Sequence, residues 1–177
     1  LPYGKGEIPL YFPENIINYD IFYPPAANKK AYSADDVRQL LNDYPFKITP
    51  QSKISIAIND KTRPLRYDVL LIPLLLYLKE RGILDRAITL YVATGTHAPF
   101  LQKELHDFIP YEVTRRYEII CHDCDANEQL SYLGKTKMGT PIWINKKFLS
   151  ADTKIALGNI EPHHFMGFSG GIKTVAI

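Results

Sequence analysis

The feature that most constrains the fold of this chain is a regular alternation of strand-like and helix-like segments that begins at Lys53. The order is strand 53–58, helix 67–82, strand 87–93, helix 99–109 and strand 117–121. Pro73 lies inside the first helical segment and predicts a kink or a late helix start. Alternating strands and helices are typical of a parallel sheet covered by helices. We therefore predict a Rossmann-like α/β fold, with a mostly parallel sheet and helices on both faces.

The segments outside this alternation complete the predicted architecture. Ser33 and Asp36 predict a short helix over residues 33–44 that begins with a capping box. Residues 130–145 alternate apolar and polar side chains and predict a β-hairpin appended to the sheet, and residues 153–160 predict a last buried strand. Five prolines near the N-terminus predict short edge strands and turns there.

Composition narrows the class of partners. The 177 residues suffice for one α/β domain with a sizeable core. Lysine and arginine number 21 against 19 acids, and this net charge of +2 is too balanced for a nucleic-acid or membrane-surface footprint. The sequence has neither an 18-residue apolar run nor a signal-peptide pattern at its start. We predict a cytoplasmic protein with a small-molecule partner, and no nucleic-acid or membrane partner.

The ends of the chain suggest a fragment. The sequence begins at Leu1 and stops at Ile177, four residues after Lys173 in a glycine-rich loop. Such a loop usually leads into a helix whose N-terminus completes an anion site, and we expect no such helix here. We interpret residues 1–177 as one cofactor-binding domain that is truncated just after this loop.

Polar side chains follow three of the predicted strands where each strand ends. The stretches are "NDKTRP" after residue 58, "TGTH" after residue 93, and "EPHHFMGFSGGIK" after residue 160. The carboxyl ends of parallel strands meet at one edge of a sheet, so these side chains are expected to line one site. The residues concerned are Asp60, Thr62, Arg63, His97, His163, His164 and Lys173.

Arg63 offers a planar fork of donors that suits a carboxylate or phosphate, and Asp60 could orient it; the alternative is a surface ion pair. His97 follows three small residues and could act as an acid or a base near neutral pH. His163 and His164 are neighbours in an extended segment, so only one is expected to face the site. We favour His163 because it directly follows Pro162.

The glycine-rich stretch "HHFMGFSGGIKT" partly matches the phosphate-binding pattern G-x-x-x-x-G-K-[ST], with Gly167, Lys173 and Thr174 in place. Ile172 stands where the last glycine belongs, and a β-branched side chain there would crowd a phosphate or disfavour the backbone angles. We therefore expect no ordinary P-loop nucleotide hydrolysis. Lys173 is then a candidate anion anchor or nucleophilic amine.

Cys121 and Cys124 form a C-x-x-C pair around His122. The pair could be redox-active, half of a zinc site, or two inert thiols. A structural zinc site normally needs four ligands, which favours inert thiols. A small zinc-binding protein is kept as an alternative function.

Four stretches, "NDKTRP", "ATGTH", "CHDCD" and "EPHHFMGFSGGIK", resemble in this order and spacing the N-terminal portion of the nickel-dependent lactate racemase family. The resemblance spans most of the chain from Lys53 onward and is weaker before it. It implies an isomerase, a racemase or epimerase of 2-hydroxy acids. It also implies a nickel-pincer nucleotide, nickel pyridinium-3,5-bisthiocarboxylic acid mononucleotide, joined through a thioamide to the lysine that matches Lys173. The histidines that match His97 and His163 exchange the substrate hydroxyl proton, while hydride passes to and from the cofactor.

The resemblance further implies that Asp60, Lys61, Thr62 and Arg63 help to hold the cofactor, and that Arg63 also steadies the substrate. A nickel-ligating histidine and a second domain lie beyond the glycine-rich loop in this family, so residues 1–177 are expected to supply no metal ligand and to have no efficient activity alone. The enzymes that make the cofactor are expected partners.

Relatives continue from the lysine into a proline-glycine turn, whereas this chain reads "KTVAI", which favours a different substrate. The alternative from another class is a nucleotide-binding or sensing module without racemase chemistry.

Overall fold

The computed structural model describes residues 2–3, 5–15, 20, 31–164 and 167–176, which belong to two compact units, residues 1–31 and 32–177. In the first unit, β1 (Pro2–Tyr3) pairs with β2 (Gly6–Glu7) in antiparallel fashion, in agreement with the predicted short strands. Every predicted site residue lies in the second unit. None of the helices in the described part of the chain is long and apolar enough to cross a membrane.

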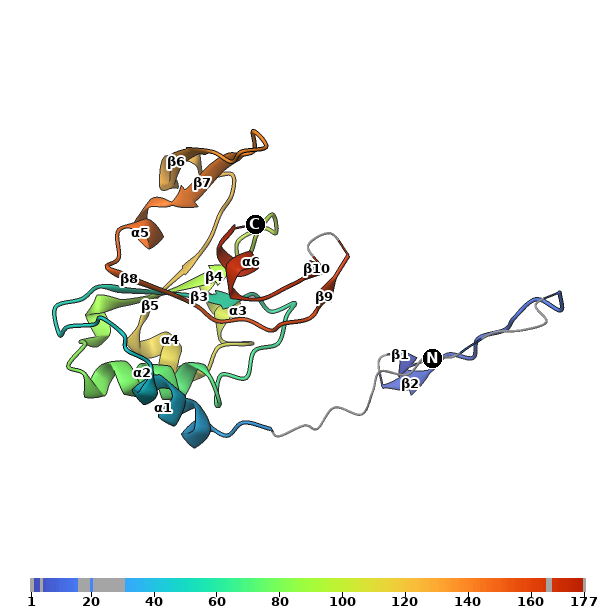
Figure 1. Ribbon diagram of the computed structural model, residues 1–177, viewed down its shortest axis with the longest axis horizontal. Helices are drawn as coiled ribbons and strands as arrows, with labels where there is room; N and C mark the ends of the chain where they lie inside the picture. Colours follow the sequence, from blue (N-terminus) through green and yellow to red (C-terminus); the bar gives the residue numbers. More distant parts are fainter. Residues whose placement is uncertain (1, 4, 16–19, 21–30, 165–166, 177) are drawn as a thin grey trace. The chain divides into compact units, whose positions relative to one another are not determined.

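The second unit is built on a four-stranded parallel sheet (Figure 1). Its strand order is β5 (Glu118–Cys121), β4 (Ile88–Ala93), β3 (Ile54–Asn59) and β8 (Thr153–Ala156). All three pairings are parallel, so the predicted α/β fold class is confirmed. β8 is only partly buried, unlike the predicted buried strand, because it lies at the edge of the sheet with a partner on one side only.

Four helices cover one face of the sheet, the lower face in Figure 1. They are α1 (Ala34–Asp43), α2 (Leu71–Glu80), α3 (Gln102–Leu105) and α4 (Tyr111–Arg116), with a short 3-10 turn at Asp85–Ala87. The capping box of Ser33 and Asp36 is confirmed at the start of α1. α2 begins late, as Pro73 indicated, and Pro73 falls in the first turn, where a missing N–H costs no helical hydrogen bond.

The predicted helix over residues 99–109 is wrong in extent. α3 covers only four residues, and the chain then forms α4, which begins directly after Pro110. Pro110 disfavours a helical backbone at Ile109, so the segment cannot run on as one helix into α4.

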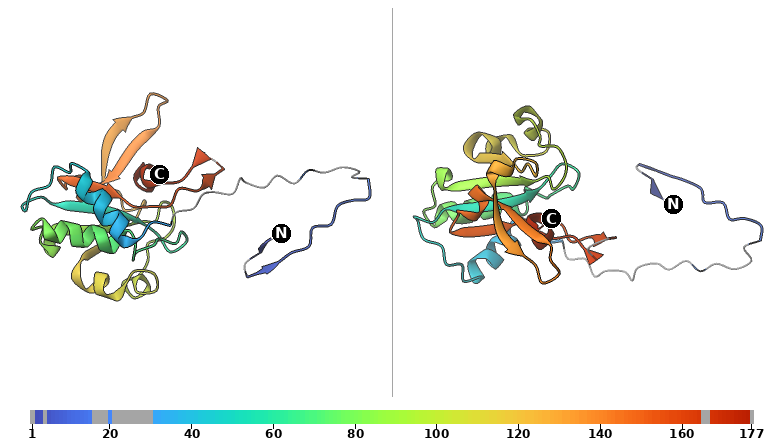
Figure 2. Two further views of the ribbon diagram at one scale, coloured as in Figure 1. Left: turned by 60° about the horizontal axis from the view of Figure 1, so that its bottom comes forward. Right: turned by 90° about the horizontal axis from the view of Figure 1, so that it is seen from above.

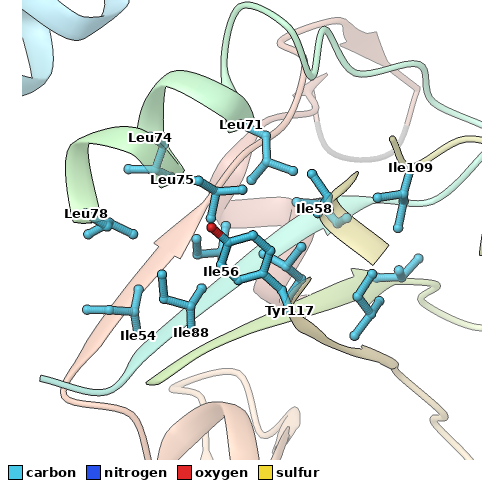
Figure 3. Packing of buried hydrophobic residues seen from close by; sticks show 14 of the residues in the cluster. Ile54, Ile56, Ile58, Leu71, Leu74, Leu75, Leu78, Ile88, Ile109 and Tyr117 are labelled. Atoms are coloured by element: carbon cyan, nitrogen blue, oxygen red, sulfur yellow. The ribbon is translucent and has the colours of Figure 1, made fainter. Parts of the chain in front are cut away.

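The main core lies between α2 and the sheet (Figure 3). Ile54, Ile56 and Ile58 of β3 point toward leucines of α2, and all of these side chains are almost completely buried. The leucines are Leu71, Leu74, Leu75 and Leu78. Burying one leucine side chain contributes about 1.5–3 kcal/mol. This packing holds β3 and its polar C-terminal end in place.

The opposite face of the sheet carries a smaller core, in which Ala57 and Tyr91 pack against Phe148 of α5 (Lys146–Leu149). The rings of Tyr91 and Phe148 meet edge to face, with centres 5.2 Å apart. Val175 of α6 (Gly171–Ala176) joins this cluster, so the predicted helices on both faces are confirmed.

The predicted hairpin is also confirmed. β6 (Leu130–Lys135), which follows a 3-10 turn at Asn127–Gln129, pairs with β7 (Pro141–Asn145) as a separate two-stranded sheet. It projects from the upper side of the parallel sheet (Figure 2).

The expectation that no helix follows the glycine-rich loop is wrong, because α6 begins at Gly171 and contains Lys173. Before it, β9 (Pro162–His163) pairs with β10 (Gly167–Phe168). A Cβ at Gly171 would lie 3.1 Å from the carbonyl oxygen of Ala156. Gly170 has a φ of +132°, which side chains rarely allow. These two glycines thus allow α6 to pack directly on β8.

Candidate functional site

The site lies where the strand order of the sheet reverses direction. The chain runs from β3 outward to β4 and β5, then returns to place β8 on the other side of β3. In open α/β sheets this switch point, at the carboxyl ends of the strands, is where ligands bind. A hydrogen bond from the side-chain amide of Asn59, at the end of β3, to Oδ1 of Asn159 bridges the segments that leave β3 and β8.

A cavity of about 440 Å³, which we call the main cavity, opens at this point. That volume suits a small organic ligand. The structure brings together here seven of the predicted site residues: Asp60, Thr62, Arg63, His97, His163, His164 and Lys173. They come from the ends of β3 and β4, from β9 and the turn after it, and from α6, although up to 113 positions separate them in the sequence, from Asp60 to Lys173.

Lys61 is the predicted site residue that does not line the main cavity. Its Nζ donates to Oε1 of Glu104 at 3.3 Å and lies 4.7 Å from the centre of the Phe100 ring. Contact between Lys61 and a ligand in the main cavity would require this ion pair to open.

Asp60 pairs with His97 rather than with Arg63. The Asp60 side chain is only 5% exposed, and its Oδ2 lies 2.7 Å from Nδ1 of His97. Its Oδ1 accepts from the N–H of Thr62 at 3.0 Å and from the Thr62 hydroxyl at 2.5 Å. Burial raises the pKa of Asp60, but the hydrogen bonds from Thr62 and His97 lower it more, so the pKa lies below the usual value of an aspartate. Asp60 is therefore ionised at neutral pH.

The expectation that Asp60 orients Arg63 is replaced by a contact that the sequence did not indicate. Nη1 of Arg63 lies 3.4 Å from Oε2 of Glu161, and both side chains are substantially exposed. Oε1 of Glu161 accepts from the amide of Asn159 at 3.0 Å. Ser169 donates to the carbonyl of Asn159 at 2.7 Å and fastens this segment to the glycine-rich loop. Glu161, Asn159 and Ser169 thus form a connected set of contacts beside Arg63.

His163 and His164 both line the main cavity, so the expectation that only one would face it is wrong. Their rings are stacked, with centres 4.9 Å apart and planes 8° from parallel. The alternation of side chains holds only within a strand, and β9 ends at His163 while His164 lies in the following turn. Desolvation lowers the pKa of His163, and the charges of Lys173, His164 and Arg63 lower it further. His163 is therefore neutral at pH 7 and able to accept a proton.

Lys173 lies in the first turn of α6 and lines the main cavity. No hydrogen bond or ion pair joins its Nζ to another of the described residues. Ile172, which marked the departure from the phosphate-binding pattern, is 87% exposed and does not line the main cavity.

A second cavity, of about 110 Å³, adjoins the main cavity and shares Ala93, Gly95 and Thr174 with it. His122 and Trp143 are among its lining residues. Burial lowers the pKa of His122 and the charge of Asp123 raises it, with burial the larger effect.

Cys121 and Cys124 are both free thiols. Burial raises the pKa of Cys121, which keeps this thiol protonated and unreactive. Within residues 31–164 and 167–176, no group of three or more histidine, cysteine or acidic side chains is arranged to hold a metal ion. The zinc alternative thus has no support in this part of the chain.

Comparison with known proteins adds independent information. Residues 3–177 match the family model of the lactate racemase N-terminal domain. The chain is 29% identical over 182 aligned residues to the lactate racemase of Thermoanaerobacterium thermosaccharolyticum, covering 99% of this chain and 42% of that protein. It is 34% identical over 122 residues to the lactate racemase of Lactiplantibacillus plantarum, covering 69% of this chain and 28% of that protein. The chain thus spans less than half the length of these curated relatives.

Solved structures agree in fold. The lactate racemase apoprotein of T. thermosaccharolyticum superposes with a TM-score of 0.67 at 27% identity, over 81% of this chain and 36% of that one. A Thermotoga maritima protein superposes with a TM-score of 0.63 at 22% identity, over 81% of this chain and 37% of that one, which supports the fold alone.

Proposed function

Since this chain belongs to the lactate racemase N-terminal domain family, we propose that it supplies the acid–base pair, the substrate cation and the cofactor-holding lysine of a 2-hydroxy acid racemase or epimerase. The observation that carries this proposal is that His97, His163, Arg63 and Lys173 line one cavity. Each of these side chains has a separate task in the reaction. The natural substrate is proposed only as a class, a small 2-hydroxy acid.

Arg63 binds the carboxylate of the substrate. Its guanidinium presents a planar fork of donors that matches a carboxylate in bidentate fashion. In the structure, Glu161 contacts this guanidinium from a partly exposed position, through a long contact of 3.4 Å. An exposed ion pair of this kind contributes at most about 1 kcal/mol. A substrate carboxylate can therefore replace Glu161 at small cost.

His97 and His163 move the hydroxyl proton. Interconversion of two enantiomers through a planar 2-keto form requires a base for one orientation of the hydroxyl group and an acid for the other. His97 comes from the end of β4 and His163 from β9, so they approach the main cavity from two different segments. One imidazole takes the proton from one enantiomer and the other returns a proton to the oxygen of its mirror image.

The residues of the main cavity fit a covalently held nucleotide cofactor. Lys173 presents its side chain at the cavity wall, and its amine is suited to a thioamide bond. When bound, a nickel-pincer nucleotide supplies a reversible acceptor for the hydrogen on carbon 2 of the substrate. Asp60, Thr62 and Arg63 adjoin the same space, and the described residues form no metal cluster of their own. The nickel would be held by the sulfurs of the cofactor and by groups outside this chain.

The proposed cofactor also implies partner proteins and a cellular compartment. A cofactor of this kind must be made and delivered by dedicated enzymes, which we propose as partners in the cytoplasm.

Intact-mass analysis tests the cofactor assignment. The protein at its natural length is produced together with the cofactor-making enzymes. A covalent adduct is expected on Lys173, absent in Lys173→Met and retained in Lys103→Met, whose lysine is exposed on α3 away from the main cavity. An unmodified Lys173 with reversible nucleotide binding would instead favour the nucleotide-sensing alternative.

Alanine variants test the acid–base assignment. A positioned general base contributes about 10² to 10⁴ in rate, so His97→Ala and His163→Ala should each lose that much racemisation while cofactor loading persists. His164→Ala is the critical comparison, because His164 also lines the main cavity and stacks on His163. Activity that survives His163→Ala but not His164→Ala would reassign the role to His164.

A further inference from the structure

Both oxygens of the Asp60 carboxylate are engaged, one by Thr62 from the loop after β3 and the other by His97 from the loop after β4. Thr62 occupies Oδ1 with both its N–H and its hydroxyl, and His97 occupies Oδ2 through Nδ1. Asp60 is 5% exposed while the side chain of His97 is 58% exposed. A buried carboxylate thus lies beneath an imidazole that opens to the main cavity.

This geometry determines which nitrogen of His97 carries the proton. An ionised carboxylate can only accept hydrogen bonds, so the nitrogen that faces it must be the donor. A contact of 2.7 Å between Nδ1 and Oδ2 therefore requires the proton on Nδ1. In the neutral imidazole the lone pair is then on Nε2, the nitrogen that does not face Asp60.

Thr62 makes the arrangement rigid. Its two donors bind the same oxygen of Asp60, which prevents the carboxylate from rotating and exchanging its oxygens at His97. The backbone N–H of His97 also donates to the backbone carbonyl of Thr94 at 3.0 Å, and this hydrogen bond closes the turn that carries the imidazole. Hydrogen bonds within their own loops thus hold both Asp60 and His97 in place.

We propose that Asp60 and Thr62 are positioning residues that hold His97 in the Nδ1–H tautomer and thereby present Nε2 as its proton-accepting atom. The tautomer follows from the chain alone, whereas its use in catalysis rests on the proposed function. In this role Asp60 acts through His97 rather than on the cofactor. This role also explains the D-x-T spacing, because a threonine two residues after the aspartate can donate both its N–H and its hydroxyl to one carboxylate oxygen.

Nitrogen NMR of the chain labelled with ¹⁵N-histidine tests the tautomer directly. At a pH where His97 is neutral, its long-range ¹H–¹⁵N pattern should be that of the Nδ1–H form, with assignment from the signal lost in His97→Ala. Asp60→Asn should shift His97 toward the Nε2–H form, because a carboxamide can donate to Nδ1. Thr62→Val, which keeps the N–H but loses the hydroxyl, should give a mixture, and Thr62→Ser should restore the wild-type pattern.

Exposed His106 provides an internal reference, because its Nδ1 contacts the hydroxyl of Thr114 and not Asp60. Its signals should be the same in all variants. An Nε2–H pattern for His97 in the wild-type chain would overturn the proposal, as would a tautomer that Asp60→Asn leaves unchanged. If Asp60→Asn fails to fold, Thr62→Val against Thr62→Ser still decides.

Kinetics of the cofactor-loaded protein at its natural length provide the second readout. In serine proteases, an Asp→Asn change that reverses the histidine tautomer lowers kcat about 10⁴-fold. We expect Asp60→Asn to lower kcat by about 10² to 10⁴ with little change in KM, and Thr62→Val to lower it less. A rise in KM at unchanged kcat would contradict a positioning role. Absence of racemisation in the wild-type protein would refute the proposed function but leave the NMR result to decide the tautomer.

Discussion

Replacing Gly158 by alanine should destabilise the fold at the junction that shapes the site. Gly158 follows β8, where the chain passes between Asn59 of β3 and Thr174 of α6. A Cβ there would lie 3.1 Å from Oδ1 of Asn59 and 3.1 Å from Oγ1 of Thr174. Neither side chain can withdraw freely, because Asn59 donates to Asn159 and Thr174 donates to the carbonyl of Gly170 at 3.1 Å.

Two effects of opposite sign determine the size of the change. Overpacking of this kind costs about 1–3 kcal/mol. The φ of Gly158 lies outside the left-handed region, so alanine also restricts the unfolded chain and recovers about 0.4–1 kcal/mol. With mid-range values for both effects, the net loss is about 1–2 kcal/mol. For a protein of this size it corresponds to a fall in Tm of about 2–8 °C.

Thermal and urea unfolding of the chain, followed by circular dichroism, measure this loss. Asn59→Ala combined with Gly158→Ala should show a favourable coupling of at least about 0.5 kcal/mol, because the side chain that obstructs the new methyl is gone. Gly139→Ala is the control: its φ of +87° makes alanine costly, but nothing lies within 4 Å, so Asn59→Ala should not relieve it. A Tm for Gly158→Ala equal to or above that of the wild type would refute the close approach.

Three further predictions concern the core and the charges of the site. Leu78→Ala should lower the free energy of unfolding by about 2–5 kcal/mol, because Leu78 is fully buried; a loss below about 1 kcal/mol in urea titrations would contradict the packing. The pKa of Asp60 is lowered in the folded chain, so its ionised form stabilises the fold above the pKa of an unfolded aspartate and loses this effect as the pH falls through the lower folded-state pKa. Asp60→Asn should thus be less stable than wild type at pH 7, with the difference in Tm shrinking below the pKa of an unfolded aspartate; a difference independent of pH would argue against the ionised pair. Lys173→Met should raise the pKa of His163 in an NMR titration by removing one of the charges that lower it, whereas Lys103→Met should leave it unchanged; equal values in both variants would show that Lys173 does not face His163.

The parallel sheet and its main helices were predictable because their signal is local. β3 and β4 are short apolar runs, and α1 and α2 show helical patterns of apolar residues. α1 also carries a capping box within four residues. Short helices carry too few turns to show a period, which is why α4 and α6 were not predicted.

The approximate location of the site was also predictable, because the carboxyl ends of parallel strands share an edge. Its internal pairings were not. His97 contacts an aspartate 37 positions earlier, and Arg63 contacts Glu161, which is 98 positions later. Such pairs depend on strand register and on the path of each loop, which a single sequence does not encode. The stacking of His164 on His163 likewise depends on the turn that follows β9. The alternation of side chains along a strand does not extend into that turn, so it could not indicate the stacking.

The proposed chemistry places the histidines at the substrate oxygen and not at carbon 2, and one isotope measurement separates these roles. The cofactor-loaded protein at its natural length is incubated in ordinary water with a single enantiomer of a 2-hydroxy acid that carries deuterium on carbon 2. Chiral separation with mass spectrometry then reports the isotope in each enantiomer. The proposal predicts that the newly formed enantiomer retains its deuterium, because His97 and His163 exchange only the hydroxyl proton. Replacement of that deuterium by solvent hydrogen would mean that a histidine removes the proton from carbon 2, and would contradict the proposed function.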